Sequence, residues 1–363
     1  MEFYIPTKIY HENGAVLNHS TEIASLGRKA FIVTGKSSAV KTGALNDVIK
    51  ALEDNDTGYI LYDKIEENPS VETIMEAADI GREGGADFVI GIGGGSPMDS
   101  AKAIALMVQN RDTAEEVLYQ ELKIKALPVV EVPTTCGTGS EVTPYAILTR
   151  NDKKTKQSIK HNIYPSVACI DAAYLKYAPV SVIRNTAIDA LGHLIESYFN
   201  KNATEYTYML CQYGLRTWAK NRTVLYDGKG FTDDNYNQLL FASTLAGMAI
   251  SHTKTSIPHG LSYYMTYNKN IPHGKAVGMF LPGYLLLMQK NFDHGYNDFI
   301  ADMGFKDLEE FKIFIRHCLG EYIITDKDAI KMVQEMLANP QKLSSVPYKI
   351  SEKELQEIIE YAR

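Results

Sequence analysis

Hydrophobic residues in the first half of the chain fall into short continuous runs that alternate with amphipathic stretches. Residues 29–34 and 86–92 are almost entirely apolar, the pattern expected of strands that are covered on both faces. After Ser70, apolar side chains recur at helical spacing, and the hydroxyl of Ser70 is suited to cap that helix. The pattern predicts strands at residues 29–34, 59–62, 86–92 and 128–132, and helices over about 43–53, from Ser70 and from about Met98.

This alternation of strands and helices predicts a doubly wound, Rossmann-like α/β domain with a parallel sheet, which we place at residues 1–178. From about Ala178 the pattern changes to long helical segments with few strand signals. Residues 179–363 are therefore expected to form a separate all-α domain. A length of 363 residues is ample for two hydrophobic cores.

Composition and charge exclude several classes of protein. A net charge of −7 and a pI near 5.8 argue against a protein that binds nucleic acid. The most apolar segment, residues 276–288, is interrupted by Gly278, Pro282 and Gly283, whereas a membrane span needs about 20 apolar residues. The four cysteines are far apart and form no CxxC pair, so we expect reduced thiols, a cytoplasmic protein and no membrane partner.

A glycine-rich segment, residues 91–102, follows one predicted strand and precedes a predicted helix. Glycines allow a phosphate to approach the backbone closely, and the N-terminus of a helix attracts its negative charge. A tight turn that needs positive φ angles would explain the glycines, but not the accompanying Ser96 and Asp99. We therefore predict that Gly94, Gly95, Ser96 and Asp99 bind a nucleotide phosphate.

A second loop, residues 133–141, combines hydroxyl groups and glycines directly after another predicted strand. These groups suit the phosphate, ribose or base edge of a nucleotide, although an ordinary hydroxyl-rich loop has the same composition. Ligands of open α/β sheets collect at the carboxyl ends of the strands. We therefore predict that Thr134, Thr135 and Thr138 belong to a cofactor site.

Four residues in the second half have the chemistry of metal ligands. Asp189 and His193 are four residues apart on a predicted helix, so both side chains project from one face. His259 and His273 each stand in a Pro-His-Gly phrase, at breaks between predicted helices. Taken singly, each histidine is better explained as a packed or surface side chain. Together, three imidazoles and one carboxylate suit Fe²⁺ or Zn²⁺.

These motifs resemble those of one family, the iron-containing alcohol dehydrogenases, over nearly the whole chain. The resemblance is carried by residues 3–10, 67–70, 93–102, 133–141, 189–196 and 245–249 and by the two Pro-His-Gly phrases. It implies a dehydroquinate synthase-like architecture in which the four candidate ligands hold one catalytic Fe²⁺, or Zn²⁺, in a cleft between the domains. It also implies hydride transfer between a nicotinamide cofactor and a small alcohol or aldehyde, and a homodimer or larger homo-oligomer.

One position departs from the family pattern. Four residues after His259, most relatives have another histidine, which relays a proton, whereas this chain has Tyr263. The Ser262-Tyr263 pair resembles a smaller branch that includes phosphonoacetaldehyde reductases and 3-deoxy-octulosonate 8-oxidases, which act on anionic substrates. Tyr263 is therefore the candidate catalytic residue, either as the proton relay or as part of the substrate pocket, and we expect the pocket role.

The cofactor position also departs from the pattern of NAD-preferring relatives. These end the first strand with an aspartate that binds the adenosine ribose, whereas this chain has Gly35, followed by Lys36 and two serines. These residues leave space and positive charge for a 2′-phosphate, so we predict NADP(H) in preference to NAD(H). The alternative is a solvated Lys36 and an NAD-dependent enzyme. With the positions that the resemblance adds, the predicted cofactor site consists of Gly35, Lys36, Ser37, Ser38, Asn68, Gly94, Gly95, Ser96, Asp99, Thr134, Thr135, Thr138 and Lys156.

Other functions fit the same fold class. A sugar-acid dehydrogenase similar to the octulosonate 8-oxidases is the main alternative. A dehydroquinate synthase-like lyase needs a site rich in lysine and arginine, and residues 258–265 and 272–279 have only Lys269 and Lys275 nearby. A nucleotide sensor without turnover has no use for four metal ligands. The sequence therefore predicts an NAD(P)-dependent iron-type alcohol dehydrogenase or aldehyde reductase.

Overall fold

The computed structural model describes residues 2–292 and 295–363, which form two compact units. Residues 4–178 form the α/β unit, and Pro179–Arg363, with the residues that precede Tyr4, form the helical unit. Within the described residues, no helix combines the length and the apolar character needed to cross a membrane. The four cysteines are buried and form no disulfide bond.

Eight strands lie in the α/β unit, and six of them form one parallel sheet in the order β1-β8-β5-β4-β2-β3. They are β1 (Lys8–His11), β2 (Lys29–Thr34), β3 (Gly58–Tyr62), β4 (Phe88–Gly93), β5 (Val129–Pro133), β6 (Ile147–Arg150), β7 (Thr155–Ser158) and β8 (Val167–Ile170). The expected strands correspond to β2, β3, β4 and β5. The prediction lacks β1, β8 and the β6-β7 hairpin, because a run of four residues is too short to show a periodicity.

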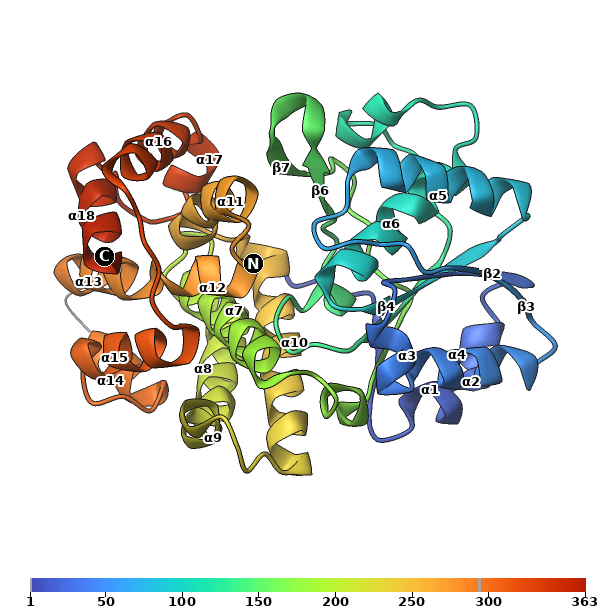
Figure 1. The fold of residues 1–363 in the computed structure, drawn as a ribbon, viewed down its shortest axis with the longest axis horizontal. Coiled ribbons are helices and arrows are strands. Elements are labelled where there is room, and N and C mark those ends of the chain that lie inside the picture. Colours follow the sequence, from blue (N-terminus) through green and yellow to red (C-terminus); the bar gives the residue numbers. More distant parts are fainter. Residues whose placement is uncertain (1, 293–294) are drawn as a thin grey trace. The chain divides into compact units, whose positions relative to one another are not determined.

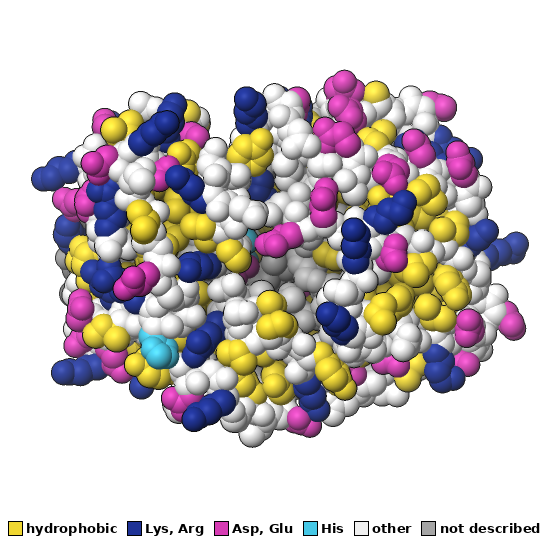
Figure 2. All heavy atoms as spheres, in the orientation of Figure 1, with side chains coloured by type: hydrophobic (Ala, Val, Ile, Leu, Met, Phe, Trp, Pro, Cys, Tyr) yellow, Lys and Arg dark blue, Asp and Glu magenta, His cyan; other side chains and the backbone are white. Residues whose placement is uncertain are grey.

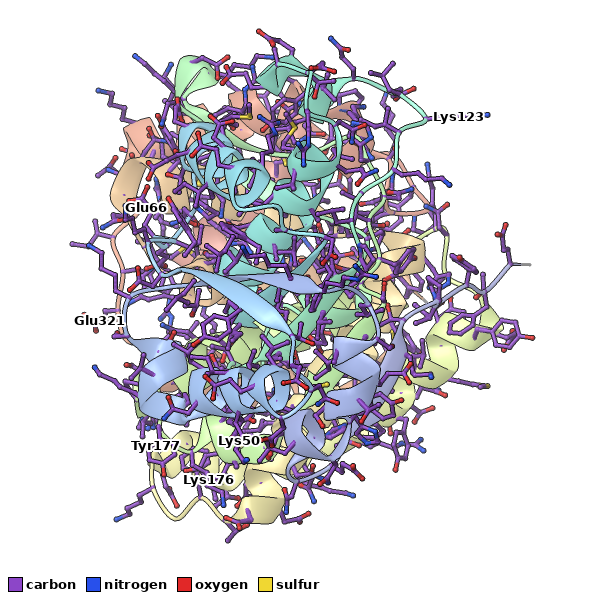
Figure 3. The ribbon with its side chains drawn as sticks, turned by 90° about the vertical axis from the view of Figure 1, so that its right-hand side faces the viewer. Lys50, Glu66, Lys123, Lys176, Tyr177 and Glu321 are labelled. Carbon is purple, nitrogen blue, oxygen red and sulfur yellow. The ribbon has the colours of Figure 1, made fainter. Side chains whose placement is uncertain are left out.

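Helices cover both faces of this sheet (Figures 1 and 3). Phe31 and Val89 pack with α5 and α6 on one face, whereas Ile32 and Ile90 pack with the helices α1 to α4 on the other. The helices are α1 (Ala15–Asn18), α2 (Ser20–Ala24), α3 (Ser38–Thr42), α4 (Ala44–Glu53), α5 (Val71–Glu83) and α6 (Gly95–Gln109), with 3-10 helices η1 (Glu115–Tyr119), η2 (Ser140–Val142), η3 (Asn151–Lys153) and η4 (Ala172–Leu175). The two-sided coverage explains why β2 and β4 have continuous apolar sequences.

The start of one helix was predicted correctly and the start of another was not. The side chain of Ser70 accepts a hydrogen bond from the backbone N–H of Thr73 over 3.2 Å and so caps α5 as predicted. Helix α6 begins at Gly95, before the predicted Met98. Proline is tolerated in the first turn of a helix, so Pro97 belongs to α6 and not to the preceding loop.

The order of the strands creates a topological switch point between β2 and β4. From β2 the chain continues to β3 on one side and then crosses to β4 on the other side. The carboxyl ends of β2 and β4 lie together, with Thr34 paired to Ile92, and β5 ends beside them, with Gly93 paired to Pro133. Ligands of open α/β sheets bind at such a point, and the predicted cofactor loops after β2, β4 and β5 all begin there.

Strand β3 forms one edge of the sheet and is exposed. Tyr59 and Leu61 are 37% and 40% accessible, whereas Tyr62, at the end of the strand, is buried. Figure 2 shows hydrophobic side chains gathered at this end of the α/β unit, between α5 and α4. The two-sided coverage therefore stops before the last strand.

The described residues of the helical unit form helices and no strand, as predicted. They are α7 (Val180–Tyr198), α8 (Glu205–Ala219), α9 (Arg222–Asp227), α10 (Asp233–Thr253), α11 (Ile257–Lys269), α12 (His273–Gly278), α13 (Leu281–Asn291), α14 (Tyr296–Asp302), α15 (Leu308–Leu319), α16 (Asp326–Leu337), α17 (Pro340–Leu343) and α18 (Glu352–Ala362). Helix α7 packs against α8, α10 and α12 (Figure 1). Buried Trp218 links α8 to α7 by a hydrogen bond, in which its indole N–H donates to the Ala187 carbonyl over 2.7 Å.

Candidate functional site

Three of the four predicted metal ligands form a close group in the helical unit. Helix α7 carries Asp189 and His193 one turn apart, and both side chains are buried. His259 lies in the first turn of α11 and is buried as well. One ligand atom from each of these residues lies within 4.8 Å of the other two. We call this group, together with His273, the metal cluster.

A buried carboxylate orients the imidazole of His259. Glu196 lies on α7, and its Oε1 is 2.5 Å from His259 Nδ1. The carboxylate also accepts hydrogen bonds from the backbone N–H groups of Ser256 and His259. With Nδ1 held by Glu196, the other ring nitrogen of His259, Nε2, faces Asp189 Oδ1 at 3.4 Å. Ligating histidines are typically held by a carboxylate in this way.

The two atoms that face each other at the centre of the metal cluster have no hydrogen-bond partner among the described residues. His259 Nε2 and Asp189 Oδ1 are both buried and unsatisfied. Buried polar atoms in folded proteins are nearly always paired, so such a pair of atoms needs an explanation. A carboxylate oxygen and imidazole nitrogens are ligands for Fe²⁺ and Zn²⁺, so the donor set fits a divalent metal.

The buried carboxylates and imidazoles shift one another's pKa values. Burial alone would lower the pKa of His259, but the carboxylates of Glu196 and Asp189 outweigh it and raise the pKa to about 9. Burial alone would raise the pKa of Asp189, but the surrounding imidazoles, above all that of His193, hold it well below its usual range. The centre of the metal cluster therefore attracts a cation, either a proton or a metal ion.

His273 lies at the edge of the metal cluster, as the first residue of α12. Its Nε2 is 3.8 Å from Asp189 Oδ1, and its side chain is 25% accessible. The following glycine makes this approach possible, because a Cβ on Gly274 would lie only 1.9 Å from the carbonyl oxygen of Asn185 on α7. The second Pro-His-Gly phrase thus lets α12 pack closely on α7 and places His273 beside Asp189.

Tyr263 lies one helical turn after His259 and is partly buried. Its ring centre is 6.4 Å from that of His273, and the ring planes are inclined by 20°. The neighbouring Ser262 hydroxyl donates to the carbonyl of His259 over 2.8 Å and is therefore turned back onto the helix. The candidate catalytic residue thus borders the metal cluster.

In the α/β unit, the two predicted nucleotide loops lie against each other. The backbone N–H of Thr134 donates over 2.8 Å to the carbonyl of the last residue of β4. A Cβ on Gly95 would lie 2.7 Å from Cγ2 of Thr138, and one on Gly94 would lie 3.2 Å from Oγ1 of Thr135. The glycines therefore allow the loops to pack closely, in addition to the role that the sequence suggests.

Three further predicted cofactor residues meet although they are far apart in the chain. Asn68, which has a φ of 58°, accepts a hydrogen bond from Lys156 Nζ through Oδ1 over 2.8 Å. The backbone N–H of Asn68 donates to the Ser96 hydroxyl over 3.2 Å. Ser96 lies in the first turn of α6, so this group stands at the positive end of that helix dipole.

Asp99 accepts hydrogen bonds from two other segments of the α/β unit. The Ser140 hydroxyl donates to Asp99 Oδ1 over 2.7 Å, and the backbone N–H of Ile147 donates to Oδ2 over 2.9 Å. Burial raises the pKa of Asp99, against the opposing charge of Lys102. Both oxygens of this carboxylate are therefore engaged inside the α/β unit.

Lys102 is fully buried beneath the same loops. Its Nζ donates to the carbonyl and the hydroxyl of Ser140, both over 2.7 Å, and to the Tyr145 carbonyl over 3.1 Å. Glu131, on β5, lies 3.6 Å away and is also fully buried. Burial raises the pKa of Glu131 to about 8, against the effect of Lys102. The ammonium group of Lys102 thus holds residues 133–141, which we call the threonine loop, in place.

The predicted 2′-phosphate residues follow β2. Lys36, Ser37 and Ser38 are exposed, and Gly35 is partly buried. The end of β2 is tied to the end of β4, because the Thr34 hydroxyl donates to the Ile92 carbonyl over 3.0 Å. These residues therefore begin at the switch point, beside the glycine loop.

The sequence-based prediction did not identify two structural roles, that of Glu196 and that of a buried group around Lys102. Glu196 follows Asp189 and His193 at the next turn of one helix face, a spacing from which it could have been recognised. The group formed by Lys102, Glu131 and Ser140 comes from three separate segments, and their spacing gives no local signal.

Comparison with known proteins decides the family. The family model of the iron-containing alcohol dehydrogenases matches the sequence at residues 6–172. The family model of their C-terminal domain matches residues 183–362. The chain belongs to the iron-containing alcohol dehydrogenase family. It is therefore a nicotinamide-dependent oxidoreductase of the alcohol dehydrogenase and aldehyde reductase class, as the sequence predicted.

Individual members of the family are similar over most of the chain. A long-chain primary alcohol dehydrogenase of Thermoanaerobacter ethanolicus is 35% identical, over 69% of this chain and 64% of that protein. A sulfoacetaldehyde reductase of Bilophila wadsworthia is 31% identical, over 77% of this chain and 72% of that protein. The crystal structure of an iron-containing alcohol dehydrogenase from Thermotoga maritima has a TM-score of 0.92 and 34% identity, with 99% of each chain covered. This last likeness confirms the predicted architecture.

Proposed function

We propose that the protein interconverts small aldehydes and alcohols with a divalent metal held by Asp189, His193, His259 and His273. The observation that carries the proposal is the pair of buried, unsatisfied atoms, His259 Nε2 and Asp189 Oδ1, which face each other at the centre of the metal cluster. Fe²⁺ is the metal that we favour, and Zn²⁺ suits the same donors.

The residues of the metal cluster have distinct tasks in this function. A divalent metal, when bound, supplies the Lewis acidity that polarises a carbonyl or acidifies an alcohol. Glu196 holds the Nδ1 proton of His259 and so keeps Nε2 available as a ligand. His273, at the partly accessible edge, leaves room beside it for a substrate oxygen.

The loops of the α/β unit are proposed to hold a nicotinamide cofactor, which supplies the hydride when bound. The glycines and the N-terminus of α6 receive the phosphates, and Asn68, Ser96 and Lys156 form one polar group beside them. Lys102 and Asp99 keep the threonine loop in place. We propose NADP(H) over NAD(H), because Gly35 and Lys36 stand where a carboxylate would repel a 2′-phosphate.

An aldehyde panel tests the proposed function. Protein reconstituted with Fe²⁺ is assayed with short aldehydes and with NADPH or NADH, and chelated protein is the control. We expect metal-dependent reduction of at least one aldehyde. No turnover of any aldehyde or alcohol by fully metallated protein would contradict the proposal.

We also propose a homo-oligomer, whose mass is a multiple of 40.5 kDa. Light scattering on the same sample tests this proposal.

Gly35→Asp tests the cofactor preference. The new carboxylate lies where we place the 2′-phosphate, so the ratio of kcat/KM for NADPH over NADH should fall by about 5- to 150-fold, or ~1–3 kcal/mol. A Cβ at this position lies 3.1 Å from the carbonyl oxygen of Ile65, so any side chain makes a tight contact there. Gly35→Asn is therefore the matched control without the charge. A wild-type protein that prefers NADH and does not respond to Gly35→Asp would exclude NADP(H).

Tyr263→Phe separates the two roles of Tyr263. We expect changed KM values and substrate range with kcat preserved within about threefold, because the ring borders His273 and lies along the substrate pocket in our proposal. Steady-state kinetics with metal analysis provides the measurement. A fall in kcat by roughly 10²–10⁴ with full metal content would instead identify Tyr263 as the proton relay.

The substrate itself is proposed to carry an anionic group. The Ser262-Tyr263 pair and the similarity to a sulfoacetaldehyde reductase support this class, and phosphonoacetaldehyde is a second candidate within it.

A further inference from the structure

A group of polar residues that includes Tyr263 contains three residues with no part in the function described so far. It consists of Lys342, Lys254, Thr255 and Tyr263, and we call it the lysine cluster. Lys342 Nζ donates a hydrogen bond to Thr255 Oγ1 and lies 5.7 Å from the centre of the Tyr263 ring. Neither partner carries a negative charge. Among the described residues, no carboxylate lies within ion-pair distance of Lys342.

The lysine cluster lies next to the metal cluster, because Lys342 packs on the turn of α11 that carries His259. Gly260 follows His259, and a Cβ at this position would lie 2.7 Å from Met336 Sδ and 3.5 Å from Lys342 Cγ. Met336 therefore occupies the space that a Cβ would need, and the stem of Lys342 packs beside it on the first turn of α11, the turn that carries His259. Tyr263 has contacts on both sides, with Lys342 and with the ring of His273.

The protein does not neutralise the positive charge of the lysine cluster. Burial, with a smaller contribution from the charge of Lys254, lowers the pKa of Lys342 to about 8 against the opposing effect of Glu196. Glu196 is the acidic group with the greatest influence, but its oxygens are engaged by His259 and by the N–H of Ser256. An anion from solution is therefore the partner that this environment lacks.

The backbone at Lys254 supports a role for its side chain. This residue ends α10 with φ of 65° and ψ of 176°, a conformation that is favourable for glycine and costly for a side chain. Lysine is thus a poor choice for folding at this position. We therefore assign the charge of Lys254 to the lysine cluster, where it acts on Lys342.

We propose that the lysine cluster binds the anionic group of the substrate, and that the protein acts on short aldehydes or alcohols that carry a sulfonate, phosphonate or carboxylate. Lys342 and Thr255 contact the oxyanion, and Lys254 adds its charge. Tyr263 separates this subsite from His273 and thereby sets the distance between the anionic group and the reacting carbonyl. The inference rests on the proposed function, which places that carbonyl at the metal cluster.

Steady-state kinetics with matched aldehydes tests the inference. Fe²⁺-loaded protein is assayed with sulfoacetaldehyde, phosphonoacetaldehyde and succinic semialdehyde, and with propanal as the neutral aldehyde. We expect a kcat/KM at least about tenfold higher for one anionic aldehyde than for propanal. In Lys342→Gln, that value should fall by about 10- to 100-fold, mainly through KM, while the value for propanal changes less than about threefold. Lys342→Arg should retain most of the preference.

Two further variants separate recognition from folding. Lys254→Gly relieves the costly backbone conformation, so it should keep or raise the thermal midpoint and still weaken the preference for the anionic aldehyde. Lys290→Gln removes a surface lysine on α13 that pairs with Glu357. It should change neither the thermal midpoint nor the preference for the anionic aldehyde. The inference would be overturned if kcat/KM fell equally for anionic and neutral aldehydes in Lys342→Gln, or if the wild type did not prefer anionic aldehydes. Neither outcome would contradict the proposed function.

A binding measurement does not depend on turnover. Ethylphosphonate, which has the anionic group but no carbonyl, is titrated into the wild-type protein and into Lys342→Gln by calorimetry. We expect binding that Lys342→Gln weakens by about tenfold or more. Absence of binding to the wild type would overturn the inference. Binding by a protein that reduces no aldehyde would instead show that the proposed function, and not the anion site, is wrong.

Discussion

His259→Ala is expected to release the divalent metal and to lower kcat by roughly 10²–10³-fold or more. The substitution removes Nε2 from the centre of the metal cluster and leaves the Glu196 carboxylate buried without its imidazole. Chelation of the wild-type protein should have the same effect, because both treatments remove the Lewis acid. The loss should appear in kcat more than in KM, since the metal acts on charge that develops during the reaction.

Elemental analysis and single-turnover kinetics of the same samples provide the measurement. His317→Ala is the matched control, because this histidine lies on α15, bonded to the Tyr226 carbonyl and outside the metal cluster. Glu196→Gln should have an intermediate effect of about 10- to 100-fold on metal affinity or activity. Full metal occupancy in His259→Ala, or in His273→Ala, would remove that residue from the ligand set.

Lys102→Met should destabilise the α/β unit by about 3–5 kcal/mol. The methionine fills most of the space but cannot donate to the carbonyls of Ser140 and Tyr145, which become unsatisfied in the interior. The buried carboxyl groups of Asp99 and Glu131 lose the charge of Lys102, which is the main attractive charge on each of them. Cofactor affinity should fall with stability, because the threonine loop loses its support.

Urea unfolding measures this loss. Lys50→Met is the control, since Lys50 lies on the surface of α4 with its side chain 61% accessible (Figure 3), and the change should stay within about 0.5 kcal/mol. Trp218, the single tryptophan, belongs to the helical unit, so circular dichroism should report a larger shift for Lys102→Met than tryptophan fluorescence does. A loss below about 1 kcal/mol would show that water replaces the ammonium group.

Local sequence patterns were sufficient for the fold class and for the central elements of the α/β unit. Strand β2 and the cap of α5 at Ser70 were predicted from neighbouring residues, because burial on both faces and helix capping act over a few positions. The pairing of Asp189 with His193 follows from helix geometry in the same way. Four-residue strands such as β1 carry too little periodicity to be recognised.

The contacts between distant segments were decided by tertiary packing. His259 meets Asp189 and Glu196 only because α11 packs on α7, and His273 reaches them only because Gly274 has no side chain. Lys342 lies beside the turn that carries His259 because α17 packs on α11. Such contacts depend on how closely two helices approach, which is a property of both surfaces together. No pattern within one segment contains that information, so these neighbours could be identified only in the folded chain.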